Sequence, residues 1–74
     1  MRITLNGEPF ETIEHITVAE LLNTLGVDGA RVAVELNLDI LPKGEYANTA
    51  LKEGDRLEVV HFVGGGKPQL EVSQ

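Results

Sequence analysis

A single helix with clear start and end signals limits the folds that this chain can adopt. The segments on both sides of the helix have the patterns of strands and turns. Thr17 and Glu20 form a capping box, in which each side chain accepts a hydrogen bond from an amide that the first helical turn leaves unpaired. Four apolar residues follow at helical spacing and form one stripe: Val18, Leu21, Leu22 and Leu25. Gly26 then offers the left-handed conformation that ends many helices. The pattern predicts a helix over about residues 18–25, with one face buried.

Strand patterns lie on both sides of this helix. Ile3 and Leu5 alternate with polar residues, and Asn6-Gly7 favours the tight turn of a hairpin with a return strand to about residue 13. Further strands are expected at about residues 32–37, 40–41 and 56–63. A right-handed crossover would make the first and last strands parallel and adjacent at the sheet centre. The predicted class is α+β, with one main helix crossing a mixed sheet of four to five strands.

Length and charge narrow the function classes. The 74 residues form one domain with a thin core, and the absence of cysteine favours a reducing compartment. Twelve acidic against six basic residues give a net charge of −6, which disfavours nucleic acid and suits a basic surface on a partner protein. No apolar run approaches the roughly 20 residues that span a bilayer, and the N-terminus has no secretory pattern. We therefore expect a cytoplasmic protein that does not contact membranes.

The last predicted strand carries apolar residues on both faces. Leu57, Val59 and Val63 are expected to face the core, which leaves Val60 and Phe62 on the opposite face. A small sheet with one helix has only one covered face. The two residues therefore predict a partner-docking patch. The alternative is that both faces of the sheet are covered, or that single exposed hydrophobic residues have no function.

Gly64-Gly65-Gly66 follow this strand directly. Three residues without Cβ atoms fit a narrow slot and reach roughly 10 Å beyond the sheet, far enough to deliver a carboxylate into a partner's active site. Ordering them costs about 1–2 kcal/mol each, so binding energy has to come from elsewhere, for which the patch is the candidate. A flexible linker is the alternative interpretation.

Over nearly all of residues 1–66 the sequence resembles the ThiS family, the sulfur carriers of thiamine thiazole synthesis. The matching segments, in order, are Leu5-Asn6-Gly7-Glu8, Thr17-Val18-Ala19-Glu20-Leu21-Leu22, Val34-Glu35-Leu36-Asn37, Ile40-Leu41-Pro42-Lys43, Leu51-Lys52-Glu53-Gly54-Asp55-Arg56-Leu57-Glu58 and Val59-Val60-His61-Phe62-Val63-Gly64-Gly65-Gly66. The resemblance implies a ubiquitin-like (β-grasp) fold.

The resemblance also implies a chemical cycle. An adenylating enzyme that uses ATP activates the carboxylate of Gly66, a sulfur donor protein converts the adenylate to a thiocarboxylate, and thiazole synthase consumes the sulfur. Gly64 and Gly65 would thread the active site of the partner. The carrier would supply no catalytic residue and bind no cofactor, so it would not itself be an enzyme.

Two features depart from the family pattern. Lys43 and Tyr46 stand where the family often has arginine and tryptophan. Residues 67–74 follow Gly66 and leave it without a free carboxylate. We expect a carrier domain at 1–66 and a flexible extension at 67–74, because Leu70 and Val72 are too few apolar residues to offset its ordering. A processing protease would then cut after Gly66.

Other functions stay open at this stage. The sulfur could go to molybdopterin or another metabolite, or the chain could be a non-covalent β-grasp interaction module with a glycine linker. His15 and His61 are too few for a metal site, and are expected in a solvated turn and half-buried in a strand. Leu51 is expected to fill the core from a loop, and Tyr46 to cap it beside Pro42.

Overall fold

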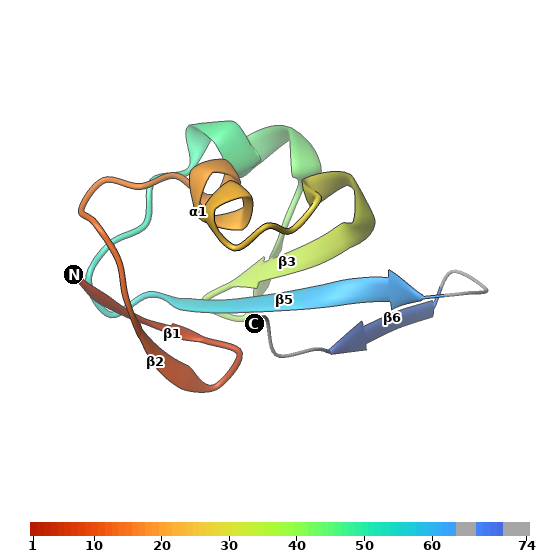
Figure 1. Ribbon diagram of the computed structural model, residues 1–74, viewed down its shortest axis with the longest axis horizontal. Coiled ribbons are helices and arrows are strands. Elements are labelled where there is room, and N and C mark those ends of the chain that lie inside the picture. The colour runs from red at the N-terminus through yellow and green to blue at the C-terminus, as the bar shows by residue number, and fades with distance from the viewer. Residues whose placement is uncertain (64–66, 71–74) are drawn as a thin grey trace.

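The structure, a computed structural model, describes residues 1–63 and 67–70, with backbone alone for 62, 63 and 67–70. Within that part of the chain the strands form one mixed sheet in the order β2-β1-β5-β3-β4, and β6 pairs with β5 (Figure 1). The strands are β1 (Arg2–Leu5), β2 (Glu8–Glu11), β3 (Val32–Leu36), β4 (Asp39–Leu41), β5 (Arg56–Val63) and β6 (Lys67–Leu70). The predicted α+β class and mixed sheet are confirmed.

The centre of the sheet has the predicted topology. β1 and β5 are parallel neighbours, with Leu5 beside Leu57. The β1–β2 hairpin turns at Asn6 and Gly7, whose φ angles of 49° and 83° are the positive values that a type I′ turn needs. β2 ends at Glu11, two residues before the expected end.

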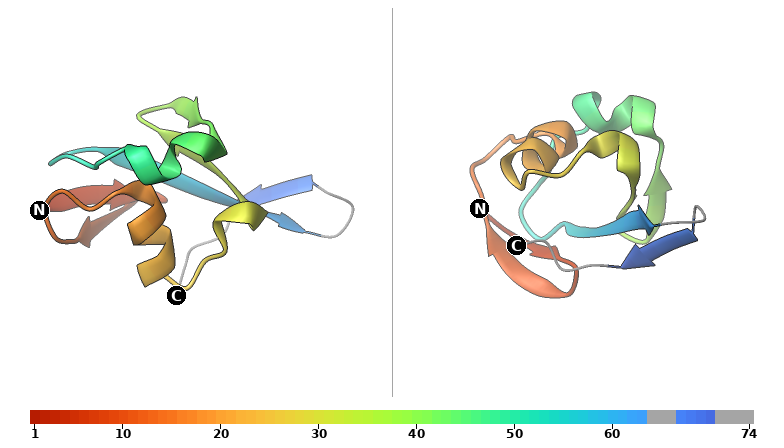
Figure 2. Two further views of the ribbon diagram at one scale, coloured as in Figure 1. Left: turned by 90° about the horizontal axis from the view of Figure 1, so that it is seen from above. Right: turned by 45° about the vertical axis from the view of Figure 1, so that its right-hand side comes forward.

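Helix α1 (Val18–Thr24) crosses one face of this sheet (Figure 2). Both bonds of the capping box form: the Glu20 amide donates to Thr17 Oγ1 over 3.1 Å, and the Thr17 amide donates to Glu20 Oε1 over 2.9 Å. Gly26 adopts a φ of 74°, the left-handed conformation expected after the helix. The helix is therefore bounded by the residues that the sequence indicated.

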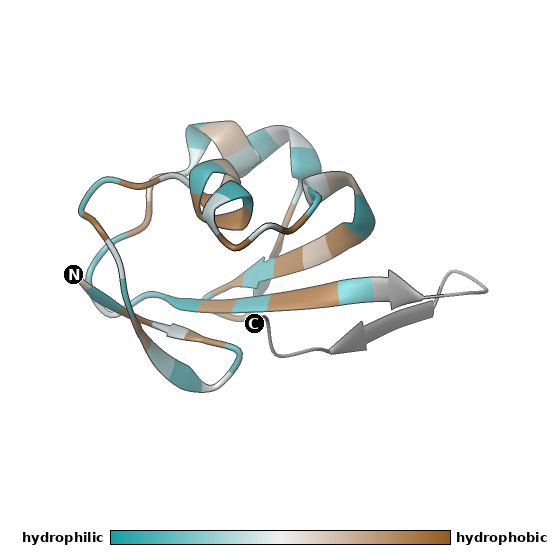
Figure 3. Ribbon diagram, viewed as in Figure 1, coloured by the Kyte–Doolittle hydropathy of each residue, from teal (hydrophilic) through white to brown (hydrophobic). Residues whose placement is uncertain are grey.

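The core lies between α1 and the sheet, and Figure 3 shows hydrophobic stretches on α1, β3 and β5, which enclose it. Leu51 and Tyr46, which lie outside the strands, pack against the core, as expected. Two short 3-10 helices complete this layer: η1 (Gly29–Arg31) and η2 (Lys43–Asn48). The buried apolar residues are Ile3, Leu5, Ile16, Val18, Leu21, Leu22, Val32, Val34, Tyr46, Leu51, Leu57 and Val59.

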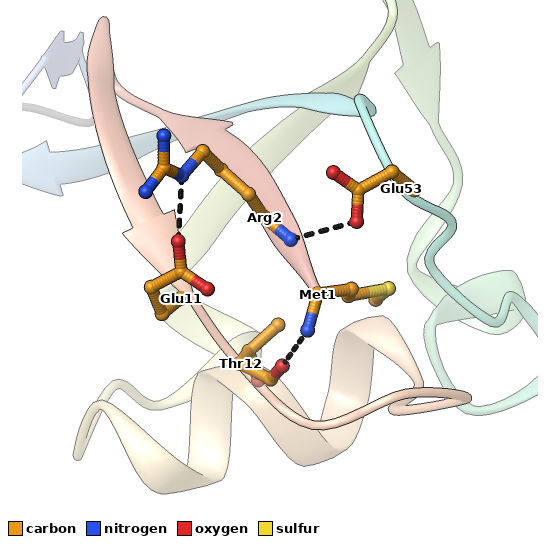
Figure 4. Close-up of polar contacts among 5 residues, drawn as sticks. All are labelled: Met1, Arg2, Glu11, Thr12 and Glu53. Carbon is orange, nitrogen blue, oxygen red and sulfur yellow. Dashed lines mark hydrogen bonds and ion pairs between the residues drawn. The ribbon is translucent and has the colours of Figure 1, made fainter.

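The N-terminal residues are tied to both neighbouring segments (Figure 4). The Met1 ammonium donates to the Thr12 carbonyl over 2.6 Å, and the Arg2 amide donates to Glu53 Oε1 over 3.0 Å. Arg2 Nε also donates to Glu11 Oε2 over 2.6 Å, but both side chains are mostly exposed, so this ion pair adds little stability. The contacts of the Met1 and Arg2 backbone nitrogens hold the open end of the β1–β2 hairpin in place.

Residues 67–70 belong to the extension that the sequence predicts to be flexible. They form β6, antiparallel to β5, with Val60 opposite Leu70 and Val63 opposite Lys67. The expectation considered only apolar side chains, whereas the edge of β5 offers backbone groups that a further strand satisfies. The structure thus describes 67–70 as a strand, while 64–66 and 71–74 lie outside the described residues, and the flexibility expected for the extension stays a prediction.

Candidate functional site

The candidate site is the C-terminal half of β5, where the predicted docking residues and the glycines meet. Leu57 and Val59 are fully buried, as the alternation predicted. Val60 is half-buried, on the opposite face. The Phe62 side chain lies outside the described part of the structure, as do Gly64, Gly65 and Gly66, so their roles stay predictions.

A side chain extends the β1–β5 ladder towards this end. Asn6 Oδ1 accepts from the Val59 amide over 2.7 Å, and Asn6 Nδ2 lies 3.4 Å from the Val59 carbonyl. The asparagine amide thus substitutes for a backbone peptide beyond the last residue of β1. It holds β5 four residues before Val63, where the described strand ends.

A second asparagine holds the other end of β5. The Asn37 amide donates to the Arg56 carbonyl over 2.8 Å, and Asn37 Oδ1 accepts from the Arg56 amide over 2.9 Å. Asn37 Nδ2 donates to Asp55 Oδ1 over 3.1 Å, and the Lys52 amide donates to Asp55 Oδ2 over 2.8 Å. These bonds satisfy the buried carboxylate of Asp55.

Sequence reasoning missed these roles of the two asparagines. The sequence patterns predict only that Asn6 lies in a turn and that Asn37 ends a strand. Both residues have positive φ angles, 49° and 53°, which asparagine tolerates better than most residues. Each asparagine directly follows a segment in which apolar and polar residues alternate. That position was the sequence signal from which its role at the end of a strand could have been predicted.

The uncovered face of the sheet combines acidic and apolar residues. Glu35 stands directly opposite Glu58, and Ala33 stands opposite Val60 in the next pair of the same face. Ile40 pairs with Glu35 from β4 and is 77% exposed. Like charges directly opposite destabilise a sheet, so this face suits a partner that brings basic groups and an apolar contact.

Lys43 and Tyr46, the two departures from the family pattern, meet at one carbonyl. The Lys43 ammonium and the Tyr46 hydroxyl both donate to the Val32 oxygen, and Lys43 Nζ lies 5.9 Å from the tyrosine ring centroid. Burial raises the pKa of the Tyr46 phenol above its ordinary value of 10.0. Both side chains thus hold the start of β3, where Val32 pairs with His61 near the end of β5.

No group of three or more His, Cys, Asp or Glu side chains in the described part of the chain could hold a metal ion. None of the helices in that part of the chain is long and apolar enough to cross a membrane. His15 is exposed and His61 half-buried, as the sequence predicted for each.

A mixed sheet crossed by one helix, with β1 and β5 parallel at its centre, defines a β-grasp domain of the ubiquitin-like type. The model of the ThiS family matches residues 3–66. The chain belongs to the ThiS family.

Named relatives agree with this assignment. The chain is 39% identical to the sulfur carrier protein ThiS of Thermus thermophilus over 64 residues, which cover 86% of this chain and 98% of that protein. The crystal structure of the thiamine biosynthesis protein ThiS from Geobacter metallireducens matches with a TM-score of 0.79 at 39% identity, covering 89% of this chain and 100% of that one.

A longer relative is also similar. The chain is 48% identical to the thiazole synthase of Paramagnetospirillum magneticum over 71 residues, or 96% of this chain. The chain spans only 22% of the length of that synthase. Because the match leaves out only three of the 74 residues, it continues past Gly66 to at least residue 71.

Proposed function

We propose that this chain is a sulfur carrier for the formation of the thiamine thiazole. The observation that supports this most is the end of the family match at Gly66, directly after a central strand held by backbone and side-chain bonds. A strand fixed in this way gives the glycine segment a rigid point of attachment. Little binding energy is then lost in positioning that segment in a partner.

The proposed chemistry uses the Gly66 carboxylate once it is free. A carboxylate is a poor electrophile, and adenylation by a partner enzyme with ATP gives it a good leaving group, AMP. A sulfur donor protein then supplies sulfur at the sulfide level. This sulfur forms a bond to the acyl carbon of the adenylate, the bond to AMP breaks, and AMP leaves with that electron pair, so that a thiocarboxylate stays on Gly66. The chain acts as a carrier and co-substrate, while the catalytic groups and ATP belong to the adenylating enzyme.

Thiazole synthase is the proposed acceptor of the sulfur. The similarity to the Paramagnetospirillum magneticum thiazole synthase supports this choice over molybdopterin. The open face around Glu35, Glu58 and Val60 is the proposed surface for docking, with Phe62 extending it. The lack of cysteine suits the cytoplasm, where we place the protein.

The test compares the full-length chain with a chain that ends at Gly66. Each is given the adenylating enzyme of its host, ATP and a sulfur donor, and intact mass spectrometry follows the product. We expect a thiocarboxylate on the shortened chain alone. A shortened chain with Gly65→Val is the control, because the added side chain should block the slot that the glycines thread. A shortened wild-type chain that binds the enzyme but stays unmodified would refute the proposal.

A second candidate function draws on β6. The pairing of Lys67–Leu70 with β5 favours an interaction module that keeps its tail and uses no covalent chemistry. Intact mass measurement on protein isolated from its host distinguishes the two candidates. A module would keep all residues through Gln74, whereas a carrier would be recovered ending at Gly66.

A further inference from the structure

The two edges of β5 are covered unequally. β3 pairs along one edge as far as His61, opposite Val32. On the other edge the β1 ladder ends at Leu57, and Asn6 extends it to Val59. The last residues of β5 therefore have an edge that neither β1 nor β3 occupies.

The hydrogen bonds identify the backbone groups that point to this edge. The Leu57 carbonyl accepts from the Asn6 amide over 2.9 Å, and both backbone groups of Val59 face the Asn6 side chain. Because backbone groups alternate between the two sides of a strand, those of His61 and Val63 point to the same edge. This edge is where β6 lies (Figure 2).

The sequence of β6 fits this edge in one register. Gln69 pairs with His61, and Lys67 pairs with Val63, so the amides of β6 are placed where β5 can accept them. Pro68 stands opposite Phe62, whose backbone groups point to the other side. A proline has no amide hydrogen, and this position needs none. A slip of one residue would put the proline where a donor is required.

The pairing of Val63 with Lys67 limits how far apart these two residues can lie. Paired residues of an antiparallel ladder have Cα atoms about 5.5 Å apart, as is expected for Val63 and Lys67. A fully extended chain would separate the same two residues by roughly 13–14 Å. The chain therefore cannot keep this pair and also thread an extended glycine segment into a partner.

We infer that β6 is a self-blocking strand, which closes the end of β5 until residues 67–70 leave it. This inference rests on the proposed function, since it concerns the segment that would enter the adenylating enzyme. A partner that receives the glycines has to surround the end of β5, where β6 now lies beside Val60. The strand would thus prevent a chain without a free Gly66 carboxylate from occupying the enzyme unproductively.

The test uses two full-length variants that differ in one backbone donor. Gln69→Pro removes the amide that faces His61, whereas Gln69→Ala keeps it. Amide hydrogen exchange by NMR first measures the protection of His61 and Val63. We expect protection in the wild type and in Gln69→Ala, and fast exchange at both amides in Gln69→Pro.

Binding to the adenylating enzyme of the host, without ATP, is then measured for the same proteins. A β6 strand that is paired nine-tenths of the time would weaken the apparent affinity about tenfold, because only the open fraction binds. Gln69→Pro should therefore bind about tenfold tighter than the wild type and approach the chain that ends at Gly66. Gln69→Ala should bind like the wild type.

The outcomes separate this inference from the proposed function. Equal binding by the wild type and Gln69→Pro would overturn the self-blocking role, even if the shortened chain accepts sulfur. Unprotected His61 and Val63 amides in the wild type would overturn it as well. Tighter binding by Gln69→Pro would support it even if the shortened chain never forms a thiocarboxylate, in which case only the proposed function fails.

Discussion

At the scale of single residues, β5 is held by two asparagines in left-handed backbone conformations. Asn37 pairs with Arg56 at the start of the strand, and Asn6 pairs with Val59 near its middle. Each uses both its turn geometry and its side-chain amide, and few other residue types supply both. The position of β5 in the sheet therefore depends on two side chains that lie outside this strand.

Asn6 allows a test in which the turn is kept and the amide removed. Asn6→Gly tolerates the positive φ but loses both bonds to Val59, so we expect a loss of about 1–2 kcal/mol in the free energy of unfolding. Denaturant unfolding and exchange of the Val59 amide measure this. The control Asn6→Asp keeps the acceptor, and should keep Val59 protected. Unchanged protection of Val59 in Asn6→Gly would contradict the role given to the amide.

Tyr46 gives a prediction about pH. Because burial raises its pKa, the neutral phenol stabilises the fold fully below the unfolded pKa of about 10, and this contribution is lost as the pH rises through the folded pKa. The melting temperature should fall more steeply above about pH 10 in the wild type than in Tyr46→Phe. The variant itself should lose about 1 kcal/mol or less at neutral pH, because Lys43 still donates to Val32. Parallel pH profiles for both proteins would disprove the assignment.

At the scale of elements, a local sequence pattern was sufficient to predict a helix or a turn wherever a single signal determines it. The capping box and Gly26 bounded α1, and Asn6-Gly7 fixed the first hairpin. The 3-10 helix η2 was not predicted, because its short segment lacks a repeating apolar pattern and gains its order by burying Tyr46. β6 was missed for another reason: its partner is the backbone at an edge, which no side-chain pattern indicates.

The open face of β3 and β5 leads to a prediction about Glu58. Glu58→Gln relieves the repulsion from Glu35 and should stabilise the domain by about 0.2–1 kcal/mol, while weakening binding to the adenylating enzyme. Thermal unfolding and a binding titration measure the two effects. Glu8→Gln on β2 faces no acidic partner across its strand pair, and should change neither. A Glu58→Gln variant that binds as tightly as the wild type would remove this face from the docking surface.

At the scale of the whole molecule, the described core is complete before the chain reaches its glycines. Among the described side chains, the last fully buried residue is Val59. A chain that ends at Gly66 should therefore stay folded, with a free energy of unfolding within about 1 kcal/mol of the full-length value. The bonds lost with β6 contribute about 1 kcal/mol each, and ordering its residues costs a similar amount. Calorimetry checks this, and an unfolded shortened chain would contradict it.

The parallel arrangement of β1 and β5 also has a mechanical consequence. A force that pulls the start of β1 and the end of β5 apart loads the bonds between these strands in shear, so several must break together. β6 is antiparallel to β5, and a pull on its free end peels it away one pair at a time. In a single-molecule pulling experiment from both ends, β6 should detach at low force, well before the domain unfolds. Pulling on the C-terminal tail would then separate β6 from β5 while the rest of the domain stays folded.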